Sequence, residues 1–268
     1  MLPDPLAATT IPAQLELWCA YPGDLFAEPV AAACVDLLTL EERERWQKLR
    51  FEPNRLEFLA SRALVRTAFS RHHPLPPAAW RFRANAYGKP EAEPACGLRF
   101  NLSNTPGLVV CLLARDVEVG VDAEPAARAA EILALAPNVF SPLELAQLES
   151  LPVSERSDRA LSLWTLKEAY IKARGLGLSL PLASFSFLFG GNQRVQLEVD
   201  PPVRDEPSRW RFSLLDFAGY RIAMMAAVPA TPVLALWEAR LFRAPPSRLS
   251  IPPEPWFPRS PVSRSPVS

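Results

Sequence analysis

The chain has 268 residues, of which 49% are hydrophobic and 22% are charged, a composition typical of a soluble globular protein with a substantial core. Its 29 basic and 29 acidic residues cancel, so no global field favours nucleic acid or an anionic membrane as a partner. The longest apolar runs, such as Leu108 to Ala114, are far too short to span a bilayer.

The first third of the chain predicts two helices and a short strand. Met1 to Gln14 has no basic segment followed by an apolar core, so we expect no secretory signal and a cytoplasmic protein. Thr39-Leu40-Glu41-Glu42 has the sequence of a capping box, which predicts a helix over Arg43 to Leu49. A second helical run is expected from about Pro53 to Arg71, and Trp80 to Arg83 is typical of a strand.

The middle of the chain predicts a polar turn and then a hairpin. Asn101 to Gly107 combines Asn, Ser, Pro and Gly, which are common in turns. Leu108 to Ala114 and Val117 to Asp122 are expected to pair as a hairpin that turns at Arg115 and Asp116.

The later part of the chain has a similar order of elements. Ser141 to Glu144 is a second capping box, and a helix from about Arg156 to Arg174 is expected to end at Gly175 and Gly177. Phe185 to Leu188 resembles a strand. Four further stretches predict an antiparallel meander with one turn at Ala218-Gly219: Arg194 to Val199, Trp210 to Phe217, Tyr220 to Val228 and Val233 to Arg240.

This order suggests a weak internal repeat of about 100 residues, although capping boxes are common and coincidence is the alternative. The repeat predicts an α+β fold of two similar halves, residues 1–116 and 117–243, related by a pseudo-two-fold axis. The crevice between the halves would then be the natural ligand site. The segment 244–268 is rich in Pro and Ser, so we expect a disordered extension and a folded part that ends near Leu241.

The number and positions of the cysteines and histidines limit which kinds of catalytic and metal site the chain can form. The four cysteines are scattered without a C-x-x-C pair, which argues against zinc and for buried free thiols in a reducing compartment. His72 and His73 are the two histidines and are adjacent, so a His-based triad or a multi-His metal centre is nearly excluded. Carboxylates, lysines and arginines must therefore carry any catalysis.

Two acidic motifs suggest a magnesium site. Asp122 and Glu124 follow a β-branched run and would share one side of a strand end, although a solvated strand end is the alternative. Trp164, Glu168 and Lys172 are spaced four residues apart, so they share one helix face. Glu168 and Lys172 alone are typical of a surface ion pair worth ~0.2–0.5 kcal/mol. The helix is apolar over most of its circumference, however, so these charges need buried partners such as a metal ion and a phosphate.

Basic and polar residues that could bind an anion lie earlier in the chain. Tyr87-Gly88-Lys89-Pro90 is a turn that could hold Lys89 toward an anion, and the turn at Asn101 to Gly107 could grip a phosphate. The first helical pair is densely basic, for which a solvated helix face is the alternative; its basic residues include Arg43, Arg45, Lys48, Arg50, Arg55, Arg62 and Arg66.

Gly120 to Glu124, and Trp164 to Lys172 with the following glycines, resemble the two signature motifs of Sfp-type 4′-phosphopantetheinyl transferases. The 46 residues from Asp122 to Glu168 fit the family's spacing. Tyr87 to Pro90 is similar to its Gly-Lys-Pro segment and Phe100 to Gly107 to its Phe-Asn-x-Ser segment. The helices over Thr39 to Arg66 resemble its basic N-terminal region, so the resemblance covers roughly residues 15 to 240.

The resemblance implies a pseudo-dimer of two α+β halves with coenzyme A between them. Such an enzyme moves the phosphopantetheine arm of coenzyme A to a serine of an apo acyl, peptidyl or aryl carrier protein and releases 3′,5′-ADP. We also expect a cytoplasmic monomer with no nucleic acid or membrane partner. The half 1–116 would contact the phosphates and adenosine, and the half 117–243 would hold the metal-binding and catalytic motifs.

By the same resemblance, Asp122, Glu124 and Glu168 would bind Mg²⁺, with Mn²⁺ as an alternative, and Lys172 would contact the pyrophosphate. Glu168, Lys172 and Asp122 form the expected catalytic set. Glu168 is the candidate base for the carrier serine, with a metal-bound hydroxide left open. The residues expected to contact coenzyme A are Arg45, Arg62, Lys89, Asn101, Ser103, Asn104 and Lys172.

One departure from the family pattern is Asn104, which stands where many relatives have a histidine that contacts a coenzyme A phosphate. Asn104 can donate a hydrogen bond but carries no charge, so phosphate binding should be weaker here or compensated by Arg62. A non-catalytic coenzyme A or nucleotide-binding module on the same scaffold is the alternative function. The acidic triad and Lys172 argue against it, because a pure binder has no need of a costly metal site.

Overall fold

The structure is a computed structural model that describes residues 13–26, 28–85, 88–190, 195–239 and 246–249. The elements of the N-terminal half are β1 (Gln14–Ala20), α1 (Glu28–Asp36), α2 (Leu40–Lys48), α3 (Glu52–His72), β2 (Arg81–Ala84), β3 (Pro90–Glu93), β4 (Leu98–Thr105) and β5 (Leu108–Arg115). The elements that follow are β6 (Val119–Pro125), α4 (Ala129–Val139), α5 (Pro142–Ser150), α6 (Val153–Arg174), β7 (Phe185–Phe189), β8 (Val195–Val199), β9 (Trp210–Phe217), β10 (Tyr220–Ala227), β11 (Val233–Glu238) and β12 (Ser247–Leu249).

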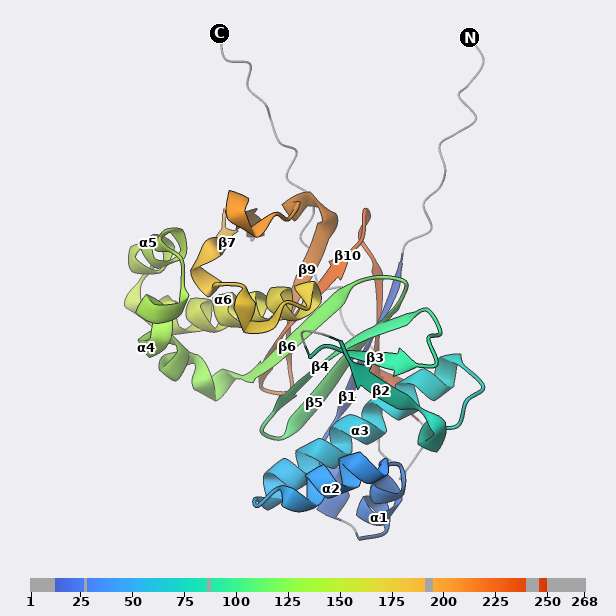
Figure 1. The fold of residues 1–268 in the computed structure, drawn as a ribbon. Helices are drawn as coiled ribbons and strands as arrows, with labels where there is room; N and C mark the ends of the chain where they lie inside the picture. Colours follow the sequence, from blue (N-terminus) through green and yellow to red (C-terminus); the bar gives the residue numbers. More distant parts are fainter. Residues whose placement is uncertain (1–12, 27, 86–87, 191–194, 240–245, 250–268) are drawn as a thin grey trace, which may run out of the picture.

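The predicted α+β fold and the internal repeat are confirmed by the strand order. One sheet contains the antiparallel series β1-β5-β4, and the other is the antiparallel series β6-β10-β9. Each half adds a two-stranded ladder, β2-β3 in the first and β7-β8 in the second. In each half one strand leads into three helices, then into the ladder and the remaining two strands. Figure 1 shows the helices of the two halves as separate groups on either side of the strands.

Both predicted capping boxes are present. Thr39 and Glu42 cap α2 reciprocally, and Ser141 and Glu144 cap α5 in the same way. The helix expected from about Arg156 begins three residues earlier, at Val153, and ends at Arg174; the next residue, Gly175, adopts a left-handed conformation with φ 64°. A left-handed residue after a helix satisfies its last carbonyl groups, and glycine adopts it without strain.

The antiparallel meander predicted for the later strands is wrong in part. β9 and β10 do pair around Ala218-Gly219, but β8 pairs with β7, and β11 pairs in parallel with β1 of the first half. β12 then pairs with β11, so residues 247–249 of the segment predicted to be an extension belong to the first sheet. These added strands cover an edge of β1 that would otherwise present unpaired backbone groups. Residues 250–268 lie outside the described residues.

The predicted hairpin between Leu108 to Ala114 and Val117 to Asp122 is wrong, because β5 and β6 belong to different sheets. The polar turn predicted over Asn101 to Gly107 is also wrong. Asn101 and Ser103 lie within β4, and the chain turns only at Pro106-Gly107. Sequence patterns identify strands, but which strands pair depends on contacts remote in the chain.

The core has three parts that follow the alternation of strand residues. α3 packs over one buried cluster of the first half, and α6 packs over a corresponding cluster of the second half. The third cluster lies between the two sheets and joins the halves. Along β5, Val109 and Cys111 face the α3 cluster, whereas Val110 and Leu112 face the other sheet. This division is the two-residue period expected of a strand buried on both faces.

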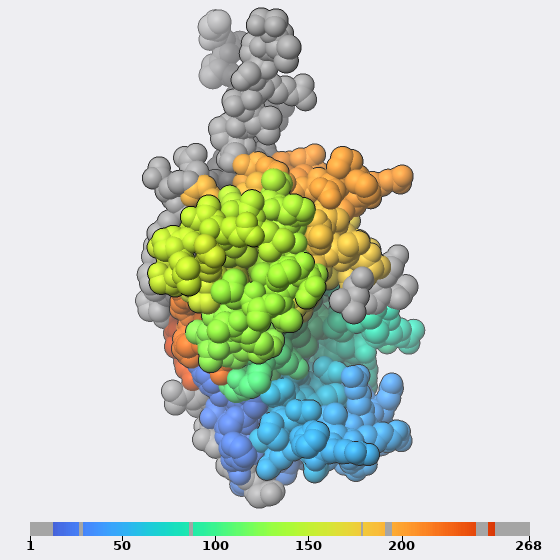
Figure 2. All heavy atoms as spheres, turned by 90° about the vertical axis from the view of Figure 1, so that its left-hand side faces the viewer, coloured from blue at the N-terminus to red at the C-terminus, as the bar shows by residue number. Residues whose placement is uncertain are grey.

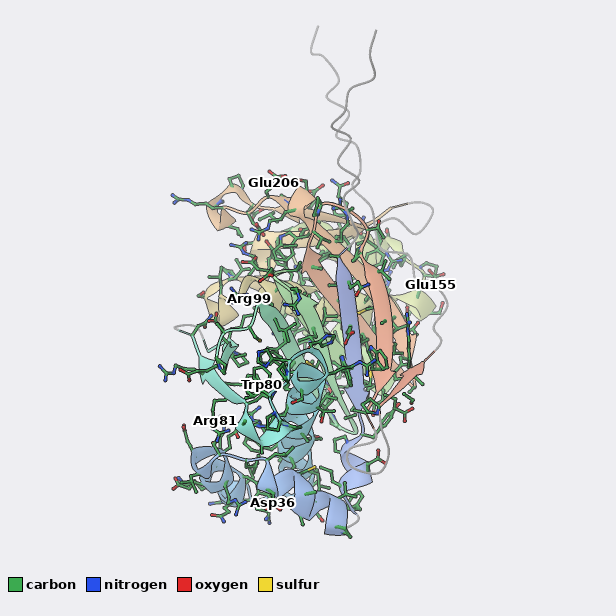
Figure 3. The ribbon with its side chains drawn as sticks, turned by 90° about the vertical axis from the view of Figure 1, so that its right-hand side faces the viewer. Asp36, Trp80, Arg81, Arg99, Glu155 and Glu206 are labelled. Carbon is green, nitrogen blue, oxygen red and sulfur yellow. The ribbon has the colours of Figure 1, made fainter. Side chains whose placement is uncertain are left out.

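The helical groups of the two halves lie toward opposite ends of the molecule, with the sheets between them. In Figure 2 the N-terminal helices, drawn in blue, form the lower part of the visible face, and the yellow-green α4 and α5 form the upper part. Figure 3 shows Asp36 and Glu206 at opposite ends of the molecule, with Trp80 beside α3 in the lower half. No helix in the described part of the chain has both the length and the apolarity that a membrane crossing requires.

Candidate active site

The two acidic motifs are brought together by the packing of α6 on β6. Gly120 makes this packing possible, because a Cβ atom there would lie 2.1 Å from the carbonyl oxygen of Ala169 and 2.4 Å from the amide nitrogen of Ala173. The close approach places Asp122 and Glu124 of β6 opposite the Glu168 face of α6. Asp122 and Glu124 are buried, with 4% and 8% of their surface exposed.

Asp122 is bound by a lysine and a serine. Lys172 Nζ lies 2.6 Å from Asp122 Oδ1, and Ser103 Oγ donates to the same oxygen at 2.9 Å. Lys172 Nζ also donates to Ser103 Oγ at 3.0 Å. The second oxygen, Asp122 Oδ2, is buried and has no hydrogen-bond partner among the described residues. A buried carboxylate oxygen without a partner is costly, and its position suits a cation ligand.

Glu124 is bound through both carboxylate oxygens. Trp164 Nε1 donates to Glu124 Oε1 at 2.9 Å, and Arg128 Nη1 donates to Glu124 Oε2 at 2.7 Å. Trp164 therefore orients an acidic residue of the site in addition to packing on the core of the second half. Arg128 was not predicted from the sequence, because Glu124 lies at the end of β6 and Arg128 in the short 3₁₀ turn that follows, so helical spacing gave no signal for this pair.

Glu168 belongs to the same electrostatic environment. Burial raises the pKa of Glu168, and the nearby carboxylates of Asp122 and Glu124 raise it further, while Lys172 acts in the opposite direction. No hydrogen bond to the Glu168 carboxylate is formed within the described ranges. A half-buried carboxylate with a raised pKa is a better proton acceptor than an ordinary one.

The donor set of Asp122, Glu124 and Glu168 suits a hard divalent cation. Three carboxylates would supply the oxygen ligands that Mg²⁺ prefers, and Asp122 Oδ2, which has no hydrogen-bond partner among the described residues, would be free to bind it. The side chains are not gathered into a finished metal cluster, since no three His, Cys, Asp or Glu residues in the described part of the chain are arranged to hold a metal. Glu124 instead faces Arg128 and Trp164, so a cation at this residue would have to share or replace these two partners.

The side chains of Asn101 and Ser103, which were predicted to contact phosphate, accept hydrogen bonds from the backbone of β6. Asn101 Oδ1 accepts from the backbone N–H of Val121 at 2.9 Å, and Ser103 Oγ accepts from the N–H of Ala123 at 3.2 Å. These side chains of β4 take the place of a partner strand along this stretch of β6, and they fix the backbone on both sides of Asp122. Asn104 is exposed and points to the opposite side of β4 from Ser103.

Lys89 has backbone partners that the sequence did not predict. Its Nζ donates to the carbonyl oxygens of Val119 and Ala173, at 3.3 and 3.1 Å. Lys89 therefore links the start of β6 to the last turn of α6, and burial lowers the pKa of Lys89. Contact between Lys89 and an anionic ligand stays a prediction.

Arg45 and Arg62 lie in the N-terminal helical group on α2 and α3 (Figure 1). Arg62 Nε is 3.0 Å from Glu42 Oε1, and the Arg45 guanidinium is 5.9 Å from the centre of the Phe58 ring. The structure thus unites Ser103, Asp122, Glu124, Glu168 and Lys172 in one cluster, whereas Arg45 and Arg62 have local partners. Their predicted contacts with coenzyme A remain untested.

Comparison with known proteins identifies the family. The model of the 4′-phosphopantetheinyl transferase superfamily matches residues 118–225, which include both acidic motifs. A 4′-phosphopantetheinyl transferase of Bacillus subtilis is 31% identical over 192 residues, which are 72% of this chain and 83% of the relative. The chain belongs to the 4′-phosphopantetheinyl transferases. The transferase Sfp of Bacillus subtilis strain 168 is 30% identical over 74% of this chain and 86% of its own length, as the motifs predicted.

More distant relatives of the transferase include HetI of Nostoc, which is 29% identical over 66% of this chain and 76% of its own length. Among solved structures, the ACPS–CoA complex of Chronobacterium ammoniagenes is 23% identical with a TM-score of 0.34. That alignment covers 41% of this chain and 95% of the other.

Proposed function

We propose that this transferase moves the 4′-phosphopantetheine group of coenzyme A to a serine of an apo acyl, peptidyl or aryl carrier protein, with Mg²⁺ or Mn²⁺ bound, and releases 3′,5′-ADP. The observation that carries the proposal is the joining of Asp122, Glu124 and Glu168 with Lys172 where α6 packs on β6. A module that only binds coenzyme A has no need of a lysine held 2.6 Å from a buried aspartate beside two further carboxylates.

The chain's residues fit the demands of phosphoryl transfer, which are mainly positioning and neutralisation of charge. Asp122, Glu124 and Glu168 would hold the divalent cation, which supplies neutralisation of the pyrophosphate when bound. Lys172 places a second positive charge beside Asp122, where it would stabilise the negative charge that develops on the leaving phosphate. Ser103 and Asn101 fix β6 and thereby the position of Asp122.

In the proposed reaction the carrier serine Oγ forms a bond to the phosphorus of the phosphopantetheine group. The P–O bond of the pyrophosphate breaks, and 3′,5′-ADP departs with the electron pair. Glu168 accepts the serine proton, directly or through a water molecule, and its raised pKa suits this role. Arg45, Arg62, Lys89 and Asn104 are proposed to contact the phosphates and adenosine. The enzyme is proposed to act in the cytoplasm as a monomer.

The test is to incubate the protein with coenzyme A, Mg²⁺ and an apo carrier protein and to measure the intact mass of the carrier. We expect a gain of one phosphopantetheine group with the wild type and none with Asp122→Ala or Glu168→Ala. Glu155→Ala, at an exposed position on the same helix, is the matched control and should transfer normally.

Circular dichroism of each variant separates loss of activity from loss of fold. Full activity in Asp122→Ala or Glu168→Ala would remove that residue from the proposed site. Coenzyme A binding without transfer to any of several carrier proteins would favour the non-catalytic module.

A further inference from the structure

Glu124 is an acidic residue of the site whose charge is already neutralised within the protein. The Arg128 guanidinium lies 2.7 Å from Glu124 Oε2, with 33% of the arginine side chain and 11% of the glutamate side chain exposed. Trp164 Nε1 occupies the other oxygen. Asp122, by contrast, keeps Oδ2 without a partner among the described residues. A cation can therefore reach Asp122 Oδ2 without breaking a hydrogen bond, while Lys172 stays on Oδ1. At Glu124 both oxygens already accept hydrogen bonds, one of them from a guanidinium.

Arg128 has a second acidic partner beside the first. Its Nη2 donates to Glu131 Oε1 at 2.7 Å and its Nε donates to Glu131 Oε2 at 3.3 Å. Glu131 lies in the first turn of α4 with 58% of its side chain exposed. The guanidinium thus bridges a buried carboxylate on one side and an exposed carboxylate on the other.

We propose that Arg128 is a built-in counter-ion of Glu124 that a divalent cation must displace, so that Arg128 sets the metal affinity of the site. The inference rests on the proposed metal-dependent function, since it concerns the same carboxylates. Mg²⁺ and a guanidinium at 2.7 Å from one carboxylate oxygen repel each other and compete for the same negative charge. Release of Arg128 breaks its bond to Glu124 and leaves both bonds to Glu131 in place.

This arrangement keeps the acidic cluster stable before a ligand arrives. Lys172 on Asp122 and Arg128 on Glu124 offset part of the repulsion among the carboxylates, and the remainder contributes to the raised pKa of Glu168. A purely orienting role for Arg128 predicts the opposite experimental result, because loss of an orienting group weakens metal binding. The sign of the change in metal affinity therefore separates the two roles.

The experiment is a titration of the full-length protein with Mn²⁺, in which electron paramagnetic resonance measures the free ion, without coenzyme A or carrier protein. Arg128→Gln is expected to bind Mn²⁺ about two- to fivefold more tightly than wild type, as loss of a partly exposed ion pair would allow. Arg83→Gln removes one positive charge from the exposed pair with Glu93 and is the matched control with unchanged affinity. Equal or weaker binding in Arg128→Gln would overturn the inference.

Glu131→Gln gives a second measurement with the opposite sign. Without the Glu131 carboxylate, the Arg128 guanidinium pairs with Glu124 alone and is harder to displace. Mn²⁺ should therefore bind at least about twofold more weakly. Unchanged or tighter Mn²⁺ binding in Glu131→Gln would contradict the proposal that Glu131 holds the Arg128 guanidinium after it leaves Glu124.

Asp122→Asn separates the inference from the proposed function. If Asp122→Asn loses Mn²⁺ binding while Arg128→Gln matches wild type, the metal site stands and the Arg128 inference fails. If Asp122→Asn binds Mn²⁺ as wild type does, the proposed metal site itself fails.

Discussion

At the scale of single residues, Gly120 decides whether the site exists. It stands where the backbones of β6 and α6 approach closely, two residues before Asp122 and opposite Ala169, which follows Glu168 in the chain. The atoms that a Cβ would meet at Gly120 belong mainly to the backbone of α6, which cannot move aside as the end of a flexible side chain can.

Gly120→Ala is expected to lower the free energy of unfolding by about 3 kcal/mol, at the upper end of the range for overpacking, and to reduce transfer activity. The reason is that α6 must shift, which moves Glu168 and Lys172 away from Asp122. Urea unfolding and the carrier mass assay measure the two effects. Gly23→Ala is the control, because its added Cβ would meet Phe26 at an ordinary 3.8 Å. Wild-type stability in Gly120→Ala would contradict the close packing described here.

At the scale of elements, each half uses its capping-box glutamate to hold the long helix. Glu144 of the second half accepts from Ser141 N and Phe187 N, both at 2.8 Å, and lies 2.8 Å from Lys167 Nζ of α6. Glu42 of the first half lies 2.7 Å from Arg66 of α3. Glu144 and Lys167 have fully buried side chains, whereas Glu42 retains 18% exposure. The repeat therefore extends from the order of elements to the buried ion pairs that join them.

Glu144→Gln should destabilise the protein by about 3–5 kcal/mol, because it leaves the buried Lys167 charge without its partner. Glu42→Gln in the other half should cost less, since water reaches Glu42. The measurement is urea unfolding of both variants against wild type. An equal decrease in the free energy of unfolding in both variants would show that burial does not determine how much each ion pair contributes to stability.

The capping boxes themselves were readable from the sequence, because Thr39 and Glu42, like Ser141 and Glu144, interact within one helical turn. Their pairing with Arg66 and Lys167 was not readable, since the partners lie 24 and 23 residues further along the chain and meet only after the helices pack. The same holds for Asn101 and Ser103, whose polar sequence suggested a turn although both side chains bind β6.

At the scale of the whole molecule, the two halves have diverged at corresponding positions. Asp122 pairs with Ala223, the fourth residue of β10, and Trp18 pairs with Cys111, the fourth residue of β5. Trp18 of β1 therefore stands where the second half has Asp122. The ring of Trp18 stacks on Trp237 of β11 at 5.4 Å, and Arg71 of α3 lies 4.0 Å from the centre of the Trp237 ring. In the first half, stacked aromatic rings therefore occupy the position that corresponds to the carboxylate cluster of the second half.

A chain that ends at Thr231 should therefore lose cooperative thermal unfolding, because it lacks β11 and with it Trp237 and the strand that covers the edge of β1. A chain that ends at Leu249 keeps every strand of the described structure and is the control. Melting followed by circular dichroism is the measurement. A wild-type melting temperature for the chain that ends at Thr231 would show that β11 is dispensable.

The longest helices, both capping boxes, most of the strands, the repeat and the family were predictable from the sequence, because these signals depend on neighbouring residues and on two well-spaced motifs, whereas α1 and α4 were not predicted. The pairing of the strands, the return of β11 and β12 to the first sheet and the contact of Arg128 with Glu124 became apparent only in the folded molecule. The physical reason is that strand pairing and buried charge contacts depend on distant parts of the chain that meet only when the two halves pack together.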